Sequence, residues 1–260
     1  MTRIEVDATR LISILLIVLI GCEILFVIGD ELFNIRRAVP LGPVRRFFDI
    51  TLEDSVASWF AITQTWMVGL TAALIYVVVA ADDKERWRRV GWVVIALFFM
   101  YMAMDDGAKF HERVGSSVRR IIQGENAQSG SRQIGFFPSY TWQLVFLPIF
   151  AAFGLFLLAF LNKELRSMRA KLTVVMAIGL FALAVIADFF EGIDSQHPLD
   201  LYSWISTTWD LNPDAVVHYS KVLEEFMEML AISLLWVVFL RHLVEIAPEV
   251  QLRFNAKRQK

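Results

Sequence analysis

Six long apolar runs constrain this chain more than any other feature of its sequence. A helix needs about 20 mostly apolar residues to cross the ~30 Å hydrocarbon core of a bilayer. Runs of about that length lie near residues 9–31, 55–81, 88–112, 139–161, 171–192 and 214–241. The sequence therefore predicts an all-α fold, a polytopic membrane helix bundle with six transmembrane helices in a single domain over residues 1–260.

The overall composition agrees with a membrane protein and excludes other classes. Hydrophobic residues make up 57% of the chain, which is above the usual share in soluble domains. The formal net charge of −2 excludes the basic footprint of a nucleic-acid-binding protein. Cys22 is the single cysteine, so no disulfide can form within the chain. The first apolar run follows Arg10 without a small-residue cleavage site, which predicts a retained helix rather than a cleaved signal.

Two of the connections between spans predict interfacial segments. The first connection contains Pro40, Pro43 and four arginines, and it is too polar and too broken to be a span. The connection between the fifth and sixth spans, residues 193–213, contains Trp204 and Trp209, which are typical of the headgroup region of a bilayer. A polar flexible loop is expected at residues 124–135 and a basic tail at 246–260.

The distribution of lysine and arginine predicts the orientation. With six spans, one side of the membrane receives the N-terminus, residues 84–89, residues 163–171 and the basic tail. This side carries more lysine and arginine than the other. The positive-inside rule then places both termini in the cytoplasm. The expected location is a cell membrane, either plasma or inner, with a multi-pass topology.

Ionisable side chains gather at corresponding ends of the third, fifth and sixth spans. At 1.5 Å per residue, Asp105, Asp188 and Glu225 lie at similar depths, about 25 Å from the inner boundary. Within each of these segments several ionisable residues share one helical face of about 120°. The three groups are Asp105, His111 and Glu112; Asp188 and Glu191; and His218, Glu224, Glu225 and Glu228. Charges in a membrane are costly, so we expect these groups to face one another across a shared pocket.

A divalent metal ion is one way to neutralise so many neighbouring carboxylates. Carboxylates with one or two imidazoles and no thiol suit iron, manganese or zinc. The predicted metal ligands are Asp105, His111, Glu112, Asp188, Glu191, His218 and Glu225. Glu224 or Glu228 would then act as the catalytic general base, with His218 as a ligand or proton shuttle. The predicted function is hydrolytic or oxidative chemistry on a lipid-like or small hydrophobic substrate.

Simpler interpretations of the same residues remain open at this point. The acidic groups can be solvated helix ends, or they can form salt bridges with Lys109 or Lys221. The chain can also be a non-enzymatic subunit that uses the polar cluster to pack or to dock a membrane-protein partner or a second copy. A cation or proton transporter is less favoured, because the inner halves of the spans are almost wholly apolar. Glu23, Gln64 and Thr65 alone offer a polar route there.

Overall fold

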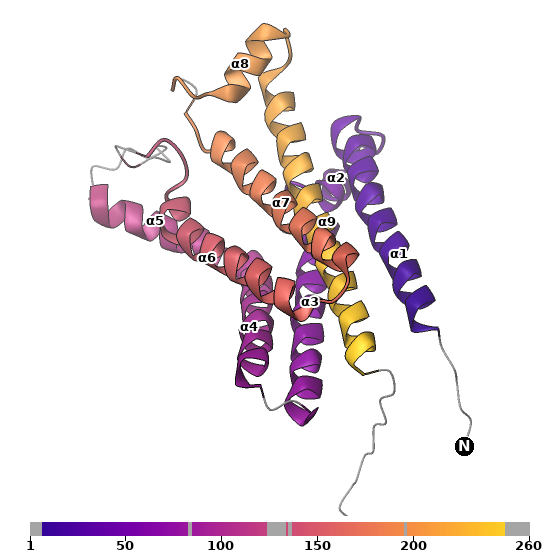
Figure 1. The fold of residues 1–260 in the computed structure, drawn as a ribbon. Coiled ribbons are helices and arrows are strands. Elements are labelled where there is room, and N and C mark those ends of the chain that lie inside the picture. The colour runs from indigo at the N-terminus through magenta and orange to yellow at the C-terminus, as the bar shows by residue number, and fades with distance from the viewer. Residues whose placement is uncertain (1–6, 83–84, 124–133, 135–136, 195–196, 248–260) are drawn as a thin grey trace, which may run out of the picture.

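The computed structural model describes residues 7–82, 85–123, 134, 137–194 and 197–247, and these residues are almost entirely helical (Figure 1). They contain no β-strand beyond one isolated bridge between Ile134 and Phe137. The helices in chain order are α1 (Ala8–Gly29), the π-helical η1 (Asp30–Ile35), α2 (Gly42–Phe48), α3 (Val56–Asp82), α4 (Arg86–Ala108), α5 (Phe110–Gln123), α6 (Thr141–Glu164), α7 (Met168–Glu191), α8 (Leu201–Thr208) and α9 (Pro213–Ile246).

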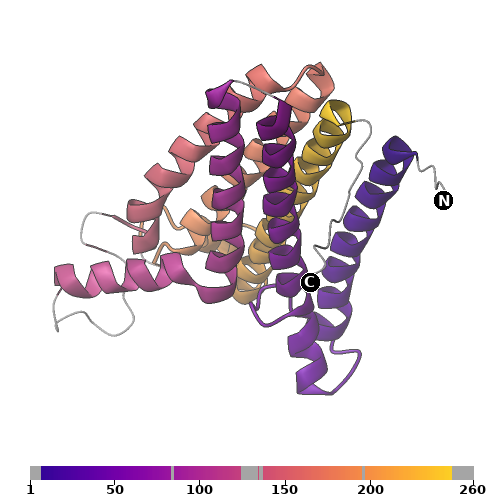
Figure 2. The same cartoon turned by 90° about the horizontal axis from the view of Figure 1, so that it is seen from below.

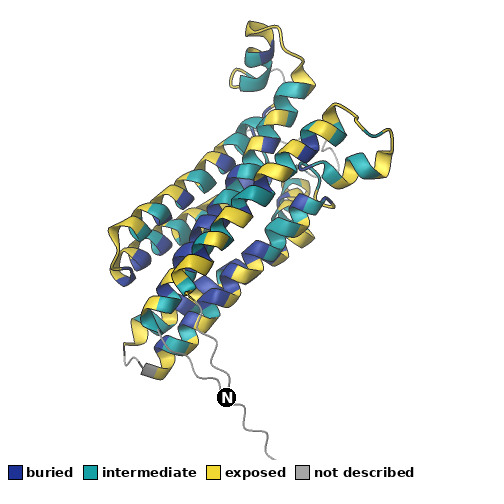
Figure 3. Cartoon of the chain, turned by 90° about the vertical axis from the view of Figure 1, so that its right-hand side faces the viewer, coloured by how far each residue is buried: buried dark blue, intermediate teal, exposed yellow. Residues whose placement is uncertain are grey.

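The prediction of an all-α bundle with six spans is confirmed. Six helices of the described chain are long and apolar enough to cross a membrane. They are α1 continued by η1, then α3, α4, α6, α7 and α9. Exposed residues run along the outward faces of these helices over the length of the bundle (Figure 3). Many of these exposed residues are large and apolar, as contact with lipid requires, so the chain is a multi-pass membrane protein.

The last helix, α9, is the centre of the bundle. It packs against α7, α3 and α1, while α4 packs against α3, and α5 against α6. The core contains Trp92 of α4 and Leu235 and Phe239 of α9, all of them buried. Lipid tails are as apolar as these side chains, so close packing holds such helices together. Gly91 shows how closely α4 and α6 approach each other, because a Cβ there would lie 2.0 Å from the Phe160 ring of α6.

The alternation of the spans defines two ends of the bundle. One end contains the start of α1 and the end of α9, and we call it the terminal end. The other contains the end of α7, at Glu191, and the start of α9, and we call it the acidic end. The short helices α2 and α8 occupy the two connections that were predicted to be interfacial. On α8 and just beyond it, Trp204 and Trp209 are exposed and pack edge to face, with ring centroids 5.6 Å apart.

The third span ends earlier than the sequence suggested. We expected one helix to continue to residue 112, but α4 ends at Ala108 because Lys109 adopts a left-handed conformation, with φ 51°. The chain then turns sharply into α5, which leaves the direction of α4 (Figure 2). Gly115 lets α5 approach α6, since a Cβ there would lie 2.6 Å from the backbone nitrogen of Trp142. Asp105 and His111 therefore lie on different helices and not on one helical face.

Candidate metal centre

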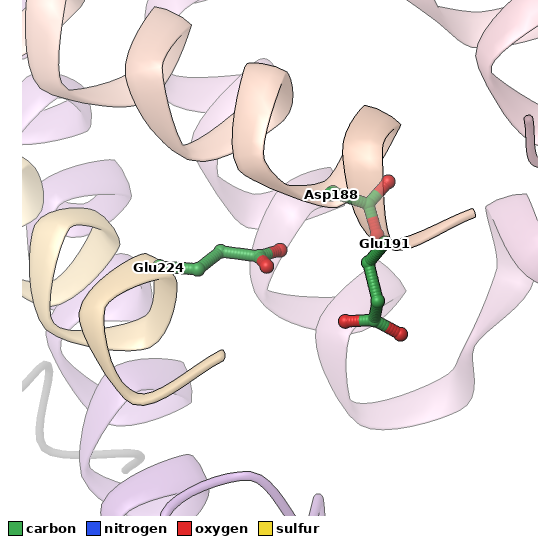
Figure 4. A group of neighbouring side chains, drawn as sticks. All are labelled: Asp188, Glu191 and Glu224. Atoms are coloured by element: carbon green, nitrogen blue, oxygen red, sulfur yellow. The ribbon is translucent and has the colours of Figure 1, made fainter. Parts of the chain in front are cut away.

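Three carboxylates from two helices converge at the acidic end. Asp188 and Glu191 are three residues apart on the last turn of α7, so they share one face of that helix. Glu224 extends toward them from α9 (Figure 4). One carboxylate oxygen from each residue lies within 4.8 Å of the other two. Among the described residues, this is the set of acidic, histidine and cysteine side chains arranged closely enough to hold a metal ion.

Helix α6 and its preceding residue position the two α7 carboxylates. Gln143 Nε2 donates to Asp188 Oδ2 at 2.8 Å, and the Tyr140 hydroxyl donates to Glu191 Oε1 at 2.6 Å. Gly192 makes this approach possible, because a Cβ at that position would lie 2.2 Å from Ser139 Oγ. These neutral donors orient the carboxylates without cancelling their charge.

The positive charge near the three carboxylates is small. Lys221 Nζ lies 3.0 Å from Glu191 Oε1, so part of the predicted salt-bridge alternative is present. Within the part of the chain that the structure describes, Glu224 has neither a hydrogen bond nor an ion pair. Glu225 and Glu228 interact electrostatically with Asp188, as does Glu224. Two like charges 4 Å apart repel by about 4 kcal/mol at an effective dielectric constant of 20. The cluster therefore needs protons or a cation in addition to Lys221.

A cavity of about 400 Å³ opens beside these carboxylates. Its lining includes Glu53, Glu112 and Glu225 in addition to Asp188, Glu191 and Glu224, with Lys221 and Arg119 as the cations. Thr141 also lines it, and the Thr141 hydroxyl is buried without a hydrogen-bond partner. Oε1 of Gln143, the residue that orients Asp188, is also buried without a hydrogen-bond partner. Since buried polar atoms are nearly always satisfied, these two oxygens fit a site that takes a cation.

His111 is held beside this cluster by Asp105. Asp105 is fully buried and accepts both the His111 backbone N–H, at 2.8 Å, and the ring Nδ1, at 2.6 Å. Burial alone would lower the pKa of His111, but the hydrogen bond and the charge of Asp105 outweigh it, so the pKa is raised. With Nδ1 bound to Asp105, Nε2 is the ring nitrogen left for a proton or a metal. His111 also interacts electrostatically with Asp188 and Glu228.

His218 belongs to a different contact. Its Nε2 lies 2.7 Å from Asp30 Oδ2, and the neighbouring Tyr219 hydroxyl donates to Glu31 at 2.8 Å. Both carboxylates lie on η1, the π-helical end of the first span. The structure therefore uses His218 to join α9 to the first span and does not bring it to the carboxylates of α7.

The remaining predicted residues surround the three convergent carboxylates. Glu225 lines the cavity, and Glu228 interacts with Glu225 and with His111. Glu112 is exposed on α5, lines the same cavity, and lies 3.9 Å from Lys109. Lys109 also forms an ion pair with Glu53.

Two residues that position the site were not predicted from the sequence. Tyr140 is the N-cap residue of α6, and Gln143 lies in its first turn, ahead of a long apolar stretch. A phenol or an amide at a helix start is ordinary in sequence, so no local pattern distinguishes them. A further acidic residue, Asp106, interacts electrostatically with Glu228 and His111; its position beside Asp105 in the third span was the available signal.

Comparisons with known proteins identify a family but not an activity. Residues 11–243 match a family model described as a domain of unknown function, DUF8692. The chain belongs to this family. No curated protein and no solved structure matches the chain.

Proposed function

We propose that this protein is a membrane-embedded metalloenzyme that binds a divalent metal ion between Asp188, Glu191 and Glu224. The convergence of three carboxylate oxygens within 4.8 Å of one another carries this proposal. The unpartnered oxygens of Thr141 and Gln143 and the small amount of nearby positive charge support it.

The chemistry of the donors favours one kind of metal. Manganese, iron and zinc all fit carboxylate-rich sites, and a set made mainly of oxygen ligands suits manganese best among them. The charge of His111 interacts with that of Asp188, so this imidazole is the candidate nitrogen ligand. Its orientation by Asp105 is the arrangement that a histidine ligand needs. His218, in contrast, stays engaged with Asp30.

Hydrolysis is the reaction class that this arrangement supports. A bound divalent metal would supply Lewis acidity and would make its water easier to deprotonate. Glu228 and His111 are the candidate residues for taking and passing on a proton, because they interact electrostatically with each other and with Asp188. Tyr140 and Gln143 hold the α7 carboxylates in position during that transfer.

The surroundings of the cavity favour a lipid-like or small hydrophobic substrate. The cavity lies where the spans end, and α5 borders it with exposed Ile121 and Ile122 beside Arg119 and Arg120. A helix of this type lies in the plane of the bilayer interface. The lysine and arginine distribution supports an acidic end outside a plasma or inner membrane, with both termini in the cytoplasm.

The direct test measures metal content and affinity. We expect about one Mn, Fe or Zn per chain in protein purified in detergent without added chelator. Glu224→Gln, which keeps the shape and removes the charge, should weaken Mn²⁺ binding by about 10–100-fold in calorimetric titration. Glu245→Gln at the terminal end is the matched control and should bind Mn²⁺ like the wild type. Equal Mn²⁺ affinity in wild-type and Glu224→Gln protein would refute the proposal.

One observation favours a second candidate function. Glu191 already pairs with Lys221 and Tyr140, as expected of a cluster that joins helices or docks a partner. In that case Glu224→Gln would raise thermal stability by removing repulsion, and metal would have no effect on the wild type.

A further inference from the structure

A second polar cluster lies deeper in the bundle, away from the acidic cavity. Glu23 of α1, Gln64 of α3 and Ser233 of α9 are all buried, with 0%, 2% and 0% of their surface exposed. Ser233 lies five residues beyond Glu228 along α9, or about 7.5 Å deeper along its axis. This cluster is independent of the proposed metal centre.

The hydrogen bonds within this cluster can be counted completely. Gln64 Nε2 donates to Glu23 Oε1 at 3.1 Å and to Ser233 Oγ at 2.8 Å, so both amide hydrogens are used. The Ser233 hydroxyl donates to Glu23 Oε1 at 2.6 Å. No side-chain hydrogen of these three residues is left over. Two acceptors nevertheless remain buried without a partner, Glu23 Oε2 and Gln64 Oε1.

The missing group is therefore a donor for these two oxygens. Within the described chain, no lysine, arginine or histidine pairs with Glu23, whose polar contacts are Gln64 and Ser233. An ionised carboxylate without a countercharge is very costly inside a membrane. A proton on Oε2 removes the charge and supplies the one missing hydrogen bond.

We propose that Glu23 is a proton-binding site, a neutral carboxylic acid whose Oε2 hydroxyl donates to Gln64 Oε1. Gln64 Nε2 donates back to Glu23 Oε1, so the acid and the amide form a reciprocal pair that Ser233 completes. This pair joins α1 to α3 and α9. Its contribution is large for α1, because the buried residues of that helix are otherwise Ile12, Leu19 and Gly29. The bound proton thus fastens the first span to the bundle.

Infrared difference spectroscopy tests the proton directly. The carbonyl band of a protonated carboxyl lies apart from the bands of carboxylates and amides. Subtracting the Glu23→Gln spectrum from that of the wild type at neutral pH should leave a carboxylic acid band. Glu112→Gln, which changes an exposed carboxylate, is the matched control and should leave only a carboxylate band. A carboxylate band in the Glu23→Gln difference spectrum would overturn the proposal.

Thermal unfolding, followed by labelling of Cys22, provides the second readout. Glu23→Gln keeps a neutral donor and acceptor facing Gln64, so its Tm should stay close to that of the wild type. Glu23→Ala removes the pair and should lower Tm by about 5–10 °C. A large Tm loss in Glu23→Gln, equal to that in Glu23→Ala, would show that the charge of Glu23 is required and would refute a bound proton.

A further variant covers the case in which Glu23→Gln does not fold. Gln64→Leu removes the acceptor of the proposed Oε2 hydrogen bond and leaves Glu23 in place. The carboxylic acid band should then persist and move to higher frequency, because its hydrogen bonds to the amide are gone. An unchanged band position would contradict the acid–amide pair.

Discussion

Replacing Gly115 with alanine tests the packing that places α5 beside the cavity. A Cβ at this position would lie 2.6 Å from the backbone nitrogen of Trp142 and 2.7 Å from its Cα. Ordinary contacts of a Cβ begin at 3.4 Å, so α5 and α6 must separate by at least about 0.8 Å. The obstacle is backbone, which cannot rotate away, and overpacking of this kind costs about 1–3 kcal/mol.

Gly179→Ala is the matched control, since nothing lies within 4 Å of the Cβ that it adds on α7. Both variants gain the general advantage of alanine over glycine in a helix, about 0.5–1 kcal/mol, so the difference between them isolates the clash. At roughly 2–4 °C per kcal/mol, Gly115→Ala should unfold about 2–12 °C below Gly179→Ala. Thermal unfolding in detergent, followed by labelling of Cys22, measures this difference.

The same substitution should affect the cavity. Gly115 and Trp142 both line it, so a displaced α5 should also weaken Mn²⁺ binding, whereas Gly179→Ala should not. A Tm for Gly115→Ala equal to or above that of Gly179→Ala would refute the close packing of α5 on α6.

Two further predictions concern charges at either end of the bundle. The pKa of His111 is raised above its ordinary value of 6.5, so its contact with Asp105 contributes fully below pH 6.5 and is lost as pH rises through the higher folded pKa. The Tm of the metal-free wild-type protein should therefore fall above about pH 6.5, relative to the Tm of His111→Gln at the same pH. Parallel Tm profiles of the two proteins over pH 6–9 would contradict this. At the terminal end, Arg88→Ala leaves the buried Glu164 carboxylate without its 2.6 Å ion pair and should cost about 3 kcal/mol. Arg46→Ala removes a pair whose side chains are 66% and 57% exposed, so it should cost much less stability than Arg88→Ala in the same unfolding assay.

The sequence alone determined the six spans and the end at which the acidic residues lie. Both follow from local composition, because the apolar length needed to cross a bilayer is a property of each run by itself. The periodicity of a helix also determines that Asp188 and Glu191 share a face, and that Glu224 shares a face with Glu225 and Glu228 on the last span. No tertiary information is needed for these conclusions.

Only the tertiary structure decided which acidic residues meet. The left-handed Lys109 ends α4 early, so a turn, and not a shared helical face, brings His111 to Asp105. His218 faces Asp30 because α1 packs against α9, a contact between residues 188 positions apart. Helical periodicity defines faces but not the neighbour that each face meets, since that depends on how whole helices rotate and cross. For the same reason, the reciprocal pairing of Glu23 with Gln64 could be seen only in the folded bundle.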